Sequence, residues 1–190
     1  MLSESFSRYI REFRKPCGLK RADIISKLNK KLQYSQIHPQ NLSNNPLRKV
    51  ILNLQSNNSN FQFLFDELWR MCITANKEWF NFNITNVSYI QLAEYDAEYE
   101  GEYKKHQDVF WINNDQYHRK LTCVIQLTDP AEYEGGDLEL FDLTEYPNAE
   151  QVRNQGTSIF FPSFVPHRAH PVTKGKRYSL AVWFEGPKWV

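Results

Sequence analysis

Hydrophobic and polar positions follow two different periods along this chain. Between Phe61 and Trp79 the apolar residues recur every three to four positions, which is the period of an amphipathic α-helix. Ser59 or Asn60, just before this series, can cap the first turn of the helix. Because an aromatic stripe at this spacing is typical of a buried helix face, we expect this helix to be structural.

The first 60 residues give a second, weaker helical pattern. Residues 1–32 are predicted to be helical with a break at Pro16-Cys17-Gly18, and the apolar positions of Ala22–Leu32 have helical spacing. Residues 33–60 are rich in Asn, Gln, Ser and Pro, which predicts a loop around a short strand at Lys49–Leu54. The N-terminal part is therefore expected to supply helices that brace a sheet formed further along the chain.

From residue 83 onward the pattern changes to short strand-like segments separated by turn residues. The candidate strands are Val87–Tyr95, Tyr103–Phe110, Leu121–Leu127, Asp137–Phe141, Thr157–Phe161 and Arg177–Phe184. Helices followed by a run of strands indicate an α+β protein, and the favoured architecture is a double-stranded β-helix (jelly roll) with N-terminal bracing helices. A chain of 190 residues is expected to form a single domain, with helical support and loop in 1–82 and the jelly-roll core in 83–190.

The formal net charge of +1 conceals two oppositely charged parts. Residues 1–49 contain 11 Lys and Arg against 3 Asp and Glu, a net of +8, whereas residues 50–190 contain 12 against 19, a net of −7. The simpler interpretation is a basic segment packed beside an acidic barrel; the alternative is contact with nucleic acid or a ribosome. The three cysteines form no metal or redox pattern, and no apolar signal or membrane-spanning run is present. This predicts a cytoplasmic protein without membrane contact.

The candidate chemistry lies in three residues of the strand-rich part, His106, Asp108 and His167. Residues two apart on a strand point to the same face, so His106 and Asp108 can bind one ion, with His167 supplied by another strand. Two histidines and one carboxylate make a facial triad that leaves coordination positions open, which suits non-haem Fe(II) and oxygen chemistry. The alternative is a surface pair on a strand. His170 is a rival to His167, and His38 and His118 are expected to be exposed.

Arg177 follows His167 by ten positions and adds a second kind of group to this set. Its guanidinium is always charged and presents a planar fork of donors that matches a carboxylate. Together with the triad it implies an oxygenase that binds iron and a dicarboxylate co-substrate.

An acidic stretch at residues 94–102 precedes the His-x-Asp pair, with all of its acids at even-numbered positions like the metal ligands. On an unbroken strand these carboxylates would share one face with the ion, and their mutual repulsion would be costly. We therefore expect a loop or bulge near Gly101. It is either a solvated acidic loop or a lid that selects a cationic substrate segment.

Three separated segments resemble a known enzyme family. They are residues 156–183 (GTSIFFPSFVPHRAHPVTKGKRYSLAVW), Tyr103–Asp108 (YKKHQD), and Arg119–Leu140 with its LTDP and EGGDL motifs. In this order they resemble the prolyl-4-hydroxylase-like group of 2-oxoglutarate/Fe(II) dioxygenases, and the bacterial PKHD-type hydroxylases in particular. The resemblance extends over about residues 61–187, and residues 1–60 match much less clearly.

The resemblance implies a role for each matching residue. His106, Asp108 and His167 would ligate Fe(II) at the catalytic centre, and Arg177 would pair with the distal carboxylate of 2-oxoglutarate. The remaining candidates are Tyr103 and Thr122 for holding the co-substrate, and Trp183, Arg119 and Tyr99 for binding the substrate. For Tyr103, Thr122, Arg119 and Trp183 the alternative role is cross-strand packing or a surface ion pair.

The implied reaction is hydroxylation of an aliphatic C–H, with release of succinate and CO2 and with ascorbate as the reductant. The favoured target is a prolyl residue in a protein or peptide, and free proline or another small amino acid is the close alternative. A cupin-like metal isomerase or hydrolase, or a non-catalytic binding barrel, are the other classes that the pattern leaves open.

Overall fold

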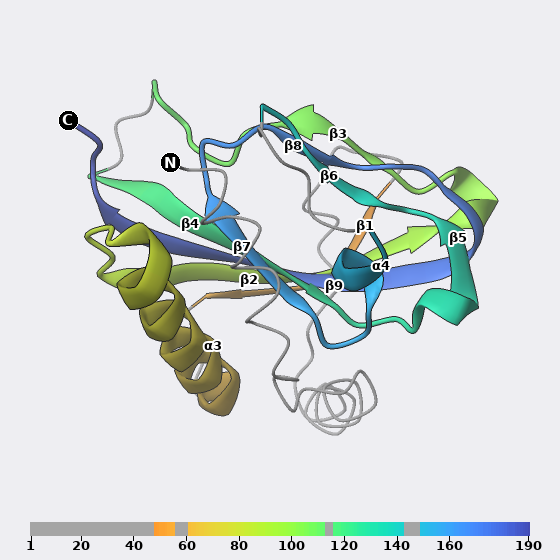
Figure 1. Ribbon diagram of the computed structural model, residues 1–190, viewed down its shortest axis with the longest axis horizontal. Helices are drawn as coiled ribbons and strands as arrows, with labels where there is room; N and C mark the ends of the chain where they lie inside the picture. Colours follow the sequence, from red (N-terminus) through yellow and green to blue (C-terminus); the bar gives the residue numbers. More distant parts are fainter. Residues whose placement is uncertain (1–47, 56–60, 113–115, 143–148) are drawn as a thin grey trace.

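Two antiparallel sheets lie face to face in the computed structural model of this chain, and one long helix packs on the outer side of the larger sheet (Figure 1). The structure describes residues 48–55, 61–112, 116–142 and 149–190. The helices predicted within residues 1–32 and the caps predicted at Ser59 or Asn60 lie outside the described residues. No helix of the described part is both long and apolar enough to cross a membrane.

The larger sheet has its longest strand, β9, between β2 and β4. Its strand order is β1-β2-β9-β4-β7, and the short strand β5 pairs with the beginning of β9; all of these pairings are antiparallel. The strands are β1 (Lys49–Gln55), β2 (Asn86–Asp96), β4 (Tyr117–Gln126), β5 (Tyr133–Gly135), β7 (Ser158–Pro162) and β9 (Val172–Pro187).

The smaller sheet consists of three short strands in the order β3-β8-β6. They are β3 (Tyr103–His106), β8 (His167–Ala169) and β6 (Leu138–Leu140). The described helical elements are α3 (Gln62–Ala75), the π-helical turn η2 (Asn76–Phe80), the 3-10 turns η3 (Ala97–Tyr99) and η4 (Pro130–Glu132), and the short helix α4 (Ala149–Arg153). The described part is thus mostly antiparallel sheet with few helices.

The alternation of side chains on β4 and β9 divides the larger sheet into two faces. The outer face packs against α3, and its side chains form one apolar cluster with the apolar stripe of that helix. The strand residues of this cluster include Leu121, Cys123, Ile125, Leu180, Val182 and Phe184, and the helix residues include Leu64, Phe65, Leu68 and Cys72. The inner face looks toward the smaller sheet and carries polar residues between small and apolar ones, among them Thr122, Gln126, Arg177 and Ser179.

The acidic stretch does break at the predicted place, and the turn there carries the chain from the larger sheet to the smaller one. The turn η3 follows β2, Glu100 has a positive φ of 49°, and the Gly101 N–H donates to the Asp96 carbonyl at 2.8 Å. A Cβ on Gly101 would lie 2.5 Å from the Asp96 nitrogen, so the turn requires glycine. Two of the acids are held elsewhere: Glu94 accepts from the Tyr178 hydroxyl at 2.5 Å, and Asp96 pairs with Lys176 at 2.5 Å.

Some element boundaries differ from those that the sequence predicts. The strand expected over Tyr103–Phe110 ends at His106, because the Asp108 N–H donates to the carbonyl of Ser163 and not to a neighbouring strand. The strand expected over Arg177–Phe184 is longer, since β9 runs past three partner strands. The elements that the sequence pattern did not predict are α4, β5 and β8. Each has five residues or fewer, too short for a periodic pattern.

Candidate metal centre

His106, Asp108 and His167 meet between the two sheets. Their nearest ligand atoms all lie within 4.8 Å of one another, with His106 Nε2 3.7 Å from Asp108 Oδ1 and His167 Nε2 3.4 Å from Asp108 Oδ2. The two imidazoles come from neighbouring strands, since His106 at the end of β3 pairs with His167 at the start of β8. Asp108 follows β3 in an irregular segment, so the expectation that it lies on the same strand as His106 is wrong, although the two side chains still converge.

The hydrogen bonds of the two imidazoles fix which ring nitrogen faces the centre of the cluster. The Nδ1 of His106 lies 2.7 Å from the Lys104 carbonyl, and the Nδ1 of His167 lies 3.0 Å from the Val165 carbonyl. Because a carbonyl oxygen only accepts, each Nδ1 carries a proton, and Nε2 is the ring nitrogen that faces Asp108 and could bind a metal ion. Burial, with a smaller effect from His167, lowers the pKa of His106 to about 4, so this ring is neutral near pH 7.

The carboxylate of Asp108 is oriented by a second pair of side chains. The Thr122 hydroxyl, on the inner face of β4, donates to Asp108 Oδ2 at 2.8 Å and lies 2.9 Å from the Ser163 hydroxyl. Ser163 also accepts the Asp108 backbone N–H through its carbonyl, at 2.9 Å. Thr122 therefore contacts the carboxylate directly, and Ser163 is a supporting residue that the sequence interpretation did not identify.

Arg177 lies on the inner face of β9 and lines the same cavity. Its side chain is 1% exposed, and its Nε and Nη2 atoms donate to Gln126 Oε1 at 3.2 and 3.0 Å. The Tyr95 ring lies beside the guanidinium, with its centroid 5.1 Å from Cζ. Gln126 fixes the direction of the fork. One signal for Gln126 was present in the sequence: it is a polar residue in the apolar run Leu121–Leu127, and its even spacing from Thr122 places both side chains on the same face of the strand.

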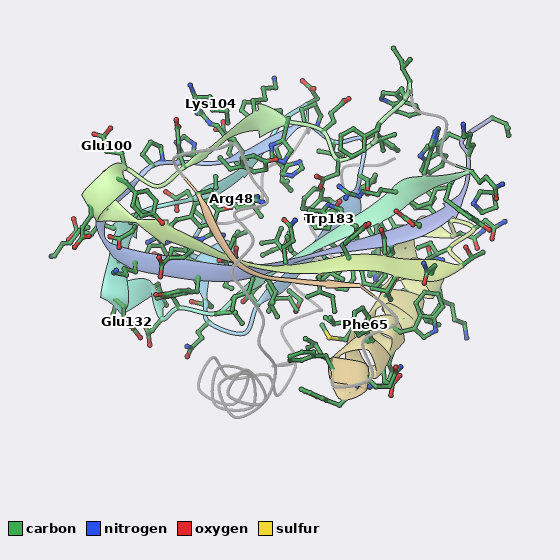
Figure 2. All side chains as sticks on the ribbon, turned by 180° about the vertical axis from the view of Figure 1, so that it is seen from behind. Arg48, Phe65, Glu100, Lys104, Glu132 and Trp183 are labelled. Carbon is green, nitrogen blue, oxygen red and sulfur yellow. The ribbon has the colours of Figure 1, made fainter. Side chains whose placement is uncertain are left out.

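Both sheets contribute to the cavity around these residues. Figure 2 shows Arg48 and Trp183 in the space between the two sheets. The described residues that line it are Arg48, Tyr95, Tyr103, His106, Asp108, Thr122, Val124, Leu138, His167, Ala169, Arg177, Ser179, Ala181 and Trp183. Arg48, just before β1, is a lining residue that the sequence interpretation did not identify.

The other predicted site residues divide between the cavity and the outside. The Tyr103 ring lies against His106, with 3.9 Å between the ring centroids, and burial raises the pKa of Tyr103, which keeps the phenol protonated. The guanidinium of Arg119 stacks on Trp183 at 4.2 Å and approaches Asp108 Oδ1 to 4.0 Å. Tyr99 is not brought to the cavity by the described structure: it belongs to the turn η3, and its hydroxyl donates to the Glu94 carbonyl at 3.2 Å.

Two further histidines lie in the described part of the chain: His170, the rival of His167 as a metal ligand, and His118. His170, the rival, points away from the cluster and lies 2.8 Å from Glu139 Oε2. His118 was expected to be exposed, and this is wrong: it is buried at the beginning of β4, its Nδ1 accepts the Trp189 backbone N–H at 3.2 Å, and its ring packs against Trp111. The polar neighbours of His118 in the sequence concealed that a sheet strand had already begun. His38 lies outside the described residues.

Comparison with known proteins gives a family from the sequence and a fold from the structure. The family model described as the 2OG-Fe(II) oxygenase superfamily matches residues 90–185. A PKHD-type hydroxylase of Colwellia psychrerythraea is 35% identical over 86 residues, which are 45% of this chain and 38% of that protein. The matched segment therefore spans well under half the length of this curated relative.

Two solved structures share the fold of this chain. A prolyl-4-hydroxylase of Pseudomonas putida has a TM-score of 0.63 at 19% identity, covering 91% of this chain and 89% of its own. A prolyl hydroxylase from Trichoplax adhaerens, in complex with a peptide fragment of the hypoxia inducible factor oxygen degradation domain, has a TM-score of 0.60 at 15% identity, covering 93% and 90%. The fold is thus like the double-stranded β-helix of prolyl hydroxylases.

Proposed function

This chain belongs to the 2OG-Fe(II) oxygenase superfamily, and on that premise we propose that it is a 2-oxoglutarate-dependent dioxygenase that hydroxylates an aliphatic C–H. In this reaction one oxygen atom of O2 enters the substrate as hydroxyl. The other enters 2-oxoglutarate, which is converted to succinate and CO2. The observation that carries the proposal is that the three-donor cluster of His106, Asp108 and His167 shares a cavity with the buried guanidinium of Arg177.

The donor set of the cluster fits Fe(II). Two imidazoles whose Nε2 atoms face Asp108, together with that carboxylate, would provide a mixed N/O shell with partial charge compensation and open positions for other ligands. His106, Asp108 and His167 would hold the ion, and bound Fe(II) supplies the binding and activation of dioxygen. Thr122 and Ser163 keep the Asp108 carboxylate aimed at the two histidines, which is a positioning role.

Arg177 is the proposed anchor of the co-substrate. A planar fork held by Gln126 can make a bidentate ion pair with the distal carboxylate of 2-oxoglutarate, and burial strengthens that pair. Tyr103 is a second candidate contact, because its protonated phenol lines the cavity beside His106. With its distal carboxylate bound by Arg177 and its keto-acid end at the metal site, the co-substrate would be held in one orientation relative to the metal ligands.

The proposed substrate is a prolyl residue in a protein or peptide. The support is the PKHD-type hydroxylase relative and the two prolyl hydroxylases that share the fold, one of them in complex with a peptide. Arg119 and Trp183 are the proposed substrate contacts, since they stack on each other next to Asp108. Free proline or another small amino acid is the alternative target, and ascorbate is the proposed reductant.

The test is succinate formation from 2-oxoglutarate by the purified protein with Fe(II) and ascorbate. We expect succinate from the wild type and none above background from His167→Ala or Arg177→Ala. The matched control is His170→Ala, which removes an imidazole three residues away on the outside of the smaller sheet and should retain full activity.

The contrary outcomes separate the alternatives. Activity that survives in Arg177→Ala would favour a cupin-like metal enzyme, because such an enzyme does not need this arginine. Absence of succinate, together with no binding of Fe(II) or 2-oxoglutarate under anaerobic conditions, would contradict the dioxygenase proposal and leave a non-catalytic barrel.

A further inference from the structure

Three consecutive large apolar side chains lie on the surface directly after the metal-ligand candidate Asp108. Asp108 and Val109 are buried, whereas Phe110, Trp111 and Ile112 are 58%, 52% and 101% exposed. Single exposed apolar side chains are ordinary on a protein surface, but a contiguous group of them marks a surface that contacts another molecule. Neither the proposed metal site nor the proposed co-substrate anchor uses these three side chains.

Phe164, in the loop before His167, extends this group. The Asp108 N–H donates to the Ser163 carbonyl at 2.9 Å, and the Gln107 side chain donates to the Phe164 carbonyl at 2.7 Å, so the loop runs beside the segment that holds Asp108. The Phe164 ring is 38% exposed. We call Phe110, Trp111, Ile112 and Phe164 the apolar patch.

A stack of side chains connects the apolar patch to the cavity. The guanidinium of Arg119 lies over both the Phe110 ring and the Trp183 ring, 5.3 and 4.2 Å from their centroids. Arg119 also approaches Asp108 Oδ1 to 4.0 Å, and Trp183 lines the cavity between the two sheets (Figure 2). A ligand that covers the patch and enters the cavity would therefore contact the protein all the way to the metal-ligand candidates.

Trp183, at the inner end of this stack, has an unpaired donor. It is 5% exposed, and its Nε1–H has no acceptor among the described residues. A buried donor without an acceptor is costly, and a ligand that places an acceptor there removes this cost. A polypeptide offers a backbone carbonyl at every residue, so its main chain is suited to this position.

We propose that the substrate is a polypeptide that passes from the cavity onto the apolar patch, where a large apolar side chain near the target residue is bound. This inference rests on the proposed function and narrows its substrate class. A free amino acid at the metal site would lie inside the cavity and leave the patch uncovered, whereas a polypeptide covers both. The patch thus favours the peptide over the free amino acid and adds a sequence preference.

Peptide binding tests this inference without turnover. The protein is loaded with Mn(II) and 2-oxoglutarate in the absence of oxygen and titrated calorimetrically with nonapeptides that have blocked ends, a central proline and otherwise Ala and Ser. Leu, Trp or Ser is placed in turn at each position before and after the proline. L-Proline is titrated in parallel.

We expect Leu or Trp at one position to bind about tenfold more tightly than Ser at that position, because burial of a large apolar side chain contributes at least this factor. The preference should disappear when Trp111→Ser is combined with Ile112→Ser; both side chains are more than half exposed, so the fold should not depend on them. Ile73→Ser is the matched control, since it removes an apolar side chain of similar exposure from α3 and should retain the preference.

Trp183→Phe tests the inner end of the proposed path. It removes the unpaired N–H and should weaken every peptide by about three- to tenfold, the value of one hydrogen bond, while the apolar preference persists. An unchanged affinity would overturn the contact between this N–H and the peptide backbone.

Three results would overturn the inference as a whole. They are equal affinities for the Leu, Trp and Ser peptides at every position, tighter binding of L-proline than of any peptide, and a preference that the double variant retains. A second copy of this chain is the competing occupant of the patch. A dimer of the wild type in analytical ultracentrifugation that becomes a monomer in the double variant would assign the patch to self-association and overturn the inference as well.

The wild type alone distinguishes this inference from the proposed function. Succinate formed by the wild type without peptide reports on the dioxygenase reaction and requires no variant of the patch. If the wild type forms succinate but shows no apolar preference, the inference fails and the reaction stands. If it forms no succinate and binds neither Fe(II) nor 2-oxoglutarate, the proposed function fails and this inference fails with it.

Discussion

The two faces of β4 and β9 perform different tasks with alternate residues of the same strands. On the outer face Cys123, Ile125 and Phe184 are fully buried against α3 and carry no charge. On the inner face the neighbouring residues Thr122 and Gln126 are also buried, but each is hydrogen-bonded to a charged group of the candidate site. Both faces are therefore buried, and they differ in what their side chains contact: apolar side chains of α3 on the outer face and charged groups on the inner face.

This difference separates the energetics of folding from those of the site. An apolar side chain on the outer face stabilises the fold through area removed from water and through tight packing. A polar side chain on the inner face adds little net stability, since its hydrogen bond replaces one to water, but it determines where a charged group points. Substitutions on the two faces should consequently affect different measurements.

The largest effect is expected from Phe184→Ala on the outer face. Phe184 is fully buried and stacks on Phe160, with ring centroids 6.1 Å apart, so its removal leaves a cavity between sheet and helix. The free energy of unfolding should fall by about 3–5 kcal/mol, measured by urea denaturation. Phe63→Ala, on the exposed side of α3, is the matched control and should change it by less than about 1 kcal/mol. Comparable losses in the two variants would mean that the outer face is not the main core.

A smaller effect is expected from Thr122→Val on the inner face, and it should appear in the affinity for the metal ion. The substitution keeps the shape of the side chain and removes the hydroxyl that donates to Asp108. Metal affinity should fall by about 10- to 100-fold, as for other residues that orient a metal ligand, and it can be measured by competition with a chelator. An unchanged affinity for Fe(II) or Mn(II) would show that Asp108 does not depend on Thr122.

Gln126→Leu should have a still smaller effect, limited to the binding of 2-oxoglutarate. Without Gln126 Oε1 the guanidinium of Arg177 loses the acceptor that fixes its direction. We expect the KM for 2-oxoglutarate to rise about tenfold while metal affinity stays constant. Direct titration of 2-oxoglutarate onto the Mn(II)-loaded protein separates binding from turnover. A parallel loss of metal affinity would contradict this separate role.

The smallest effect is expected from Tyr178→Phe, at a polar contact on the outer side of the sheet. The variant removes the hydroxyl that donates to Glu94 and leaves the ring packed against the apolar cluster. Stability should fall by about 1 kcal/mol, and succinate formation per folded molecule should not change. Reduced activity in this variant would show that the two faces are coupled.

The sequence predicted the parts of this molecule that depend on short-range regularity. The period of α3, the alternation along β2 and β4, and the break near Gly101 all follow from residues close together in the chain. The three metal-ligand candidates and Arg177 were identified because residue type and spacing together restrict the chemistry. The structure brings those four side chains to one cavity.

What the sequence did not provide are roles that arise only from pairing between distant segments. Gln126 is 51 positions from Arg177, and nothing in its neighbourhood indicates that the two side chains meet. Arg48 reaches Tyr103 only because β1 pairs with β2 at the edge of the larger sheet. Tyr99 was assigned to substrate binding by the family resemblance alone, but the turn near Gly101 directs its hydroxyl toward the Glu94 carbonyl.

The length and central position of β9 also restrict how this protein can evolve. Its 16 residues are hydrogen-bonded to strands on both edges, and they carry Arg177 and Trp183 on the same face. Inserting or deleting one residue between these two would exchange the faces for every residue beyond it, placing a charged or polar group against α3. New substrate preferences must therefore arise by replacing inner-face residues one at a time, or by changing the length of the segments that connect the strands. β9 itself is expected to keep a constant length among descendants that retain the activity.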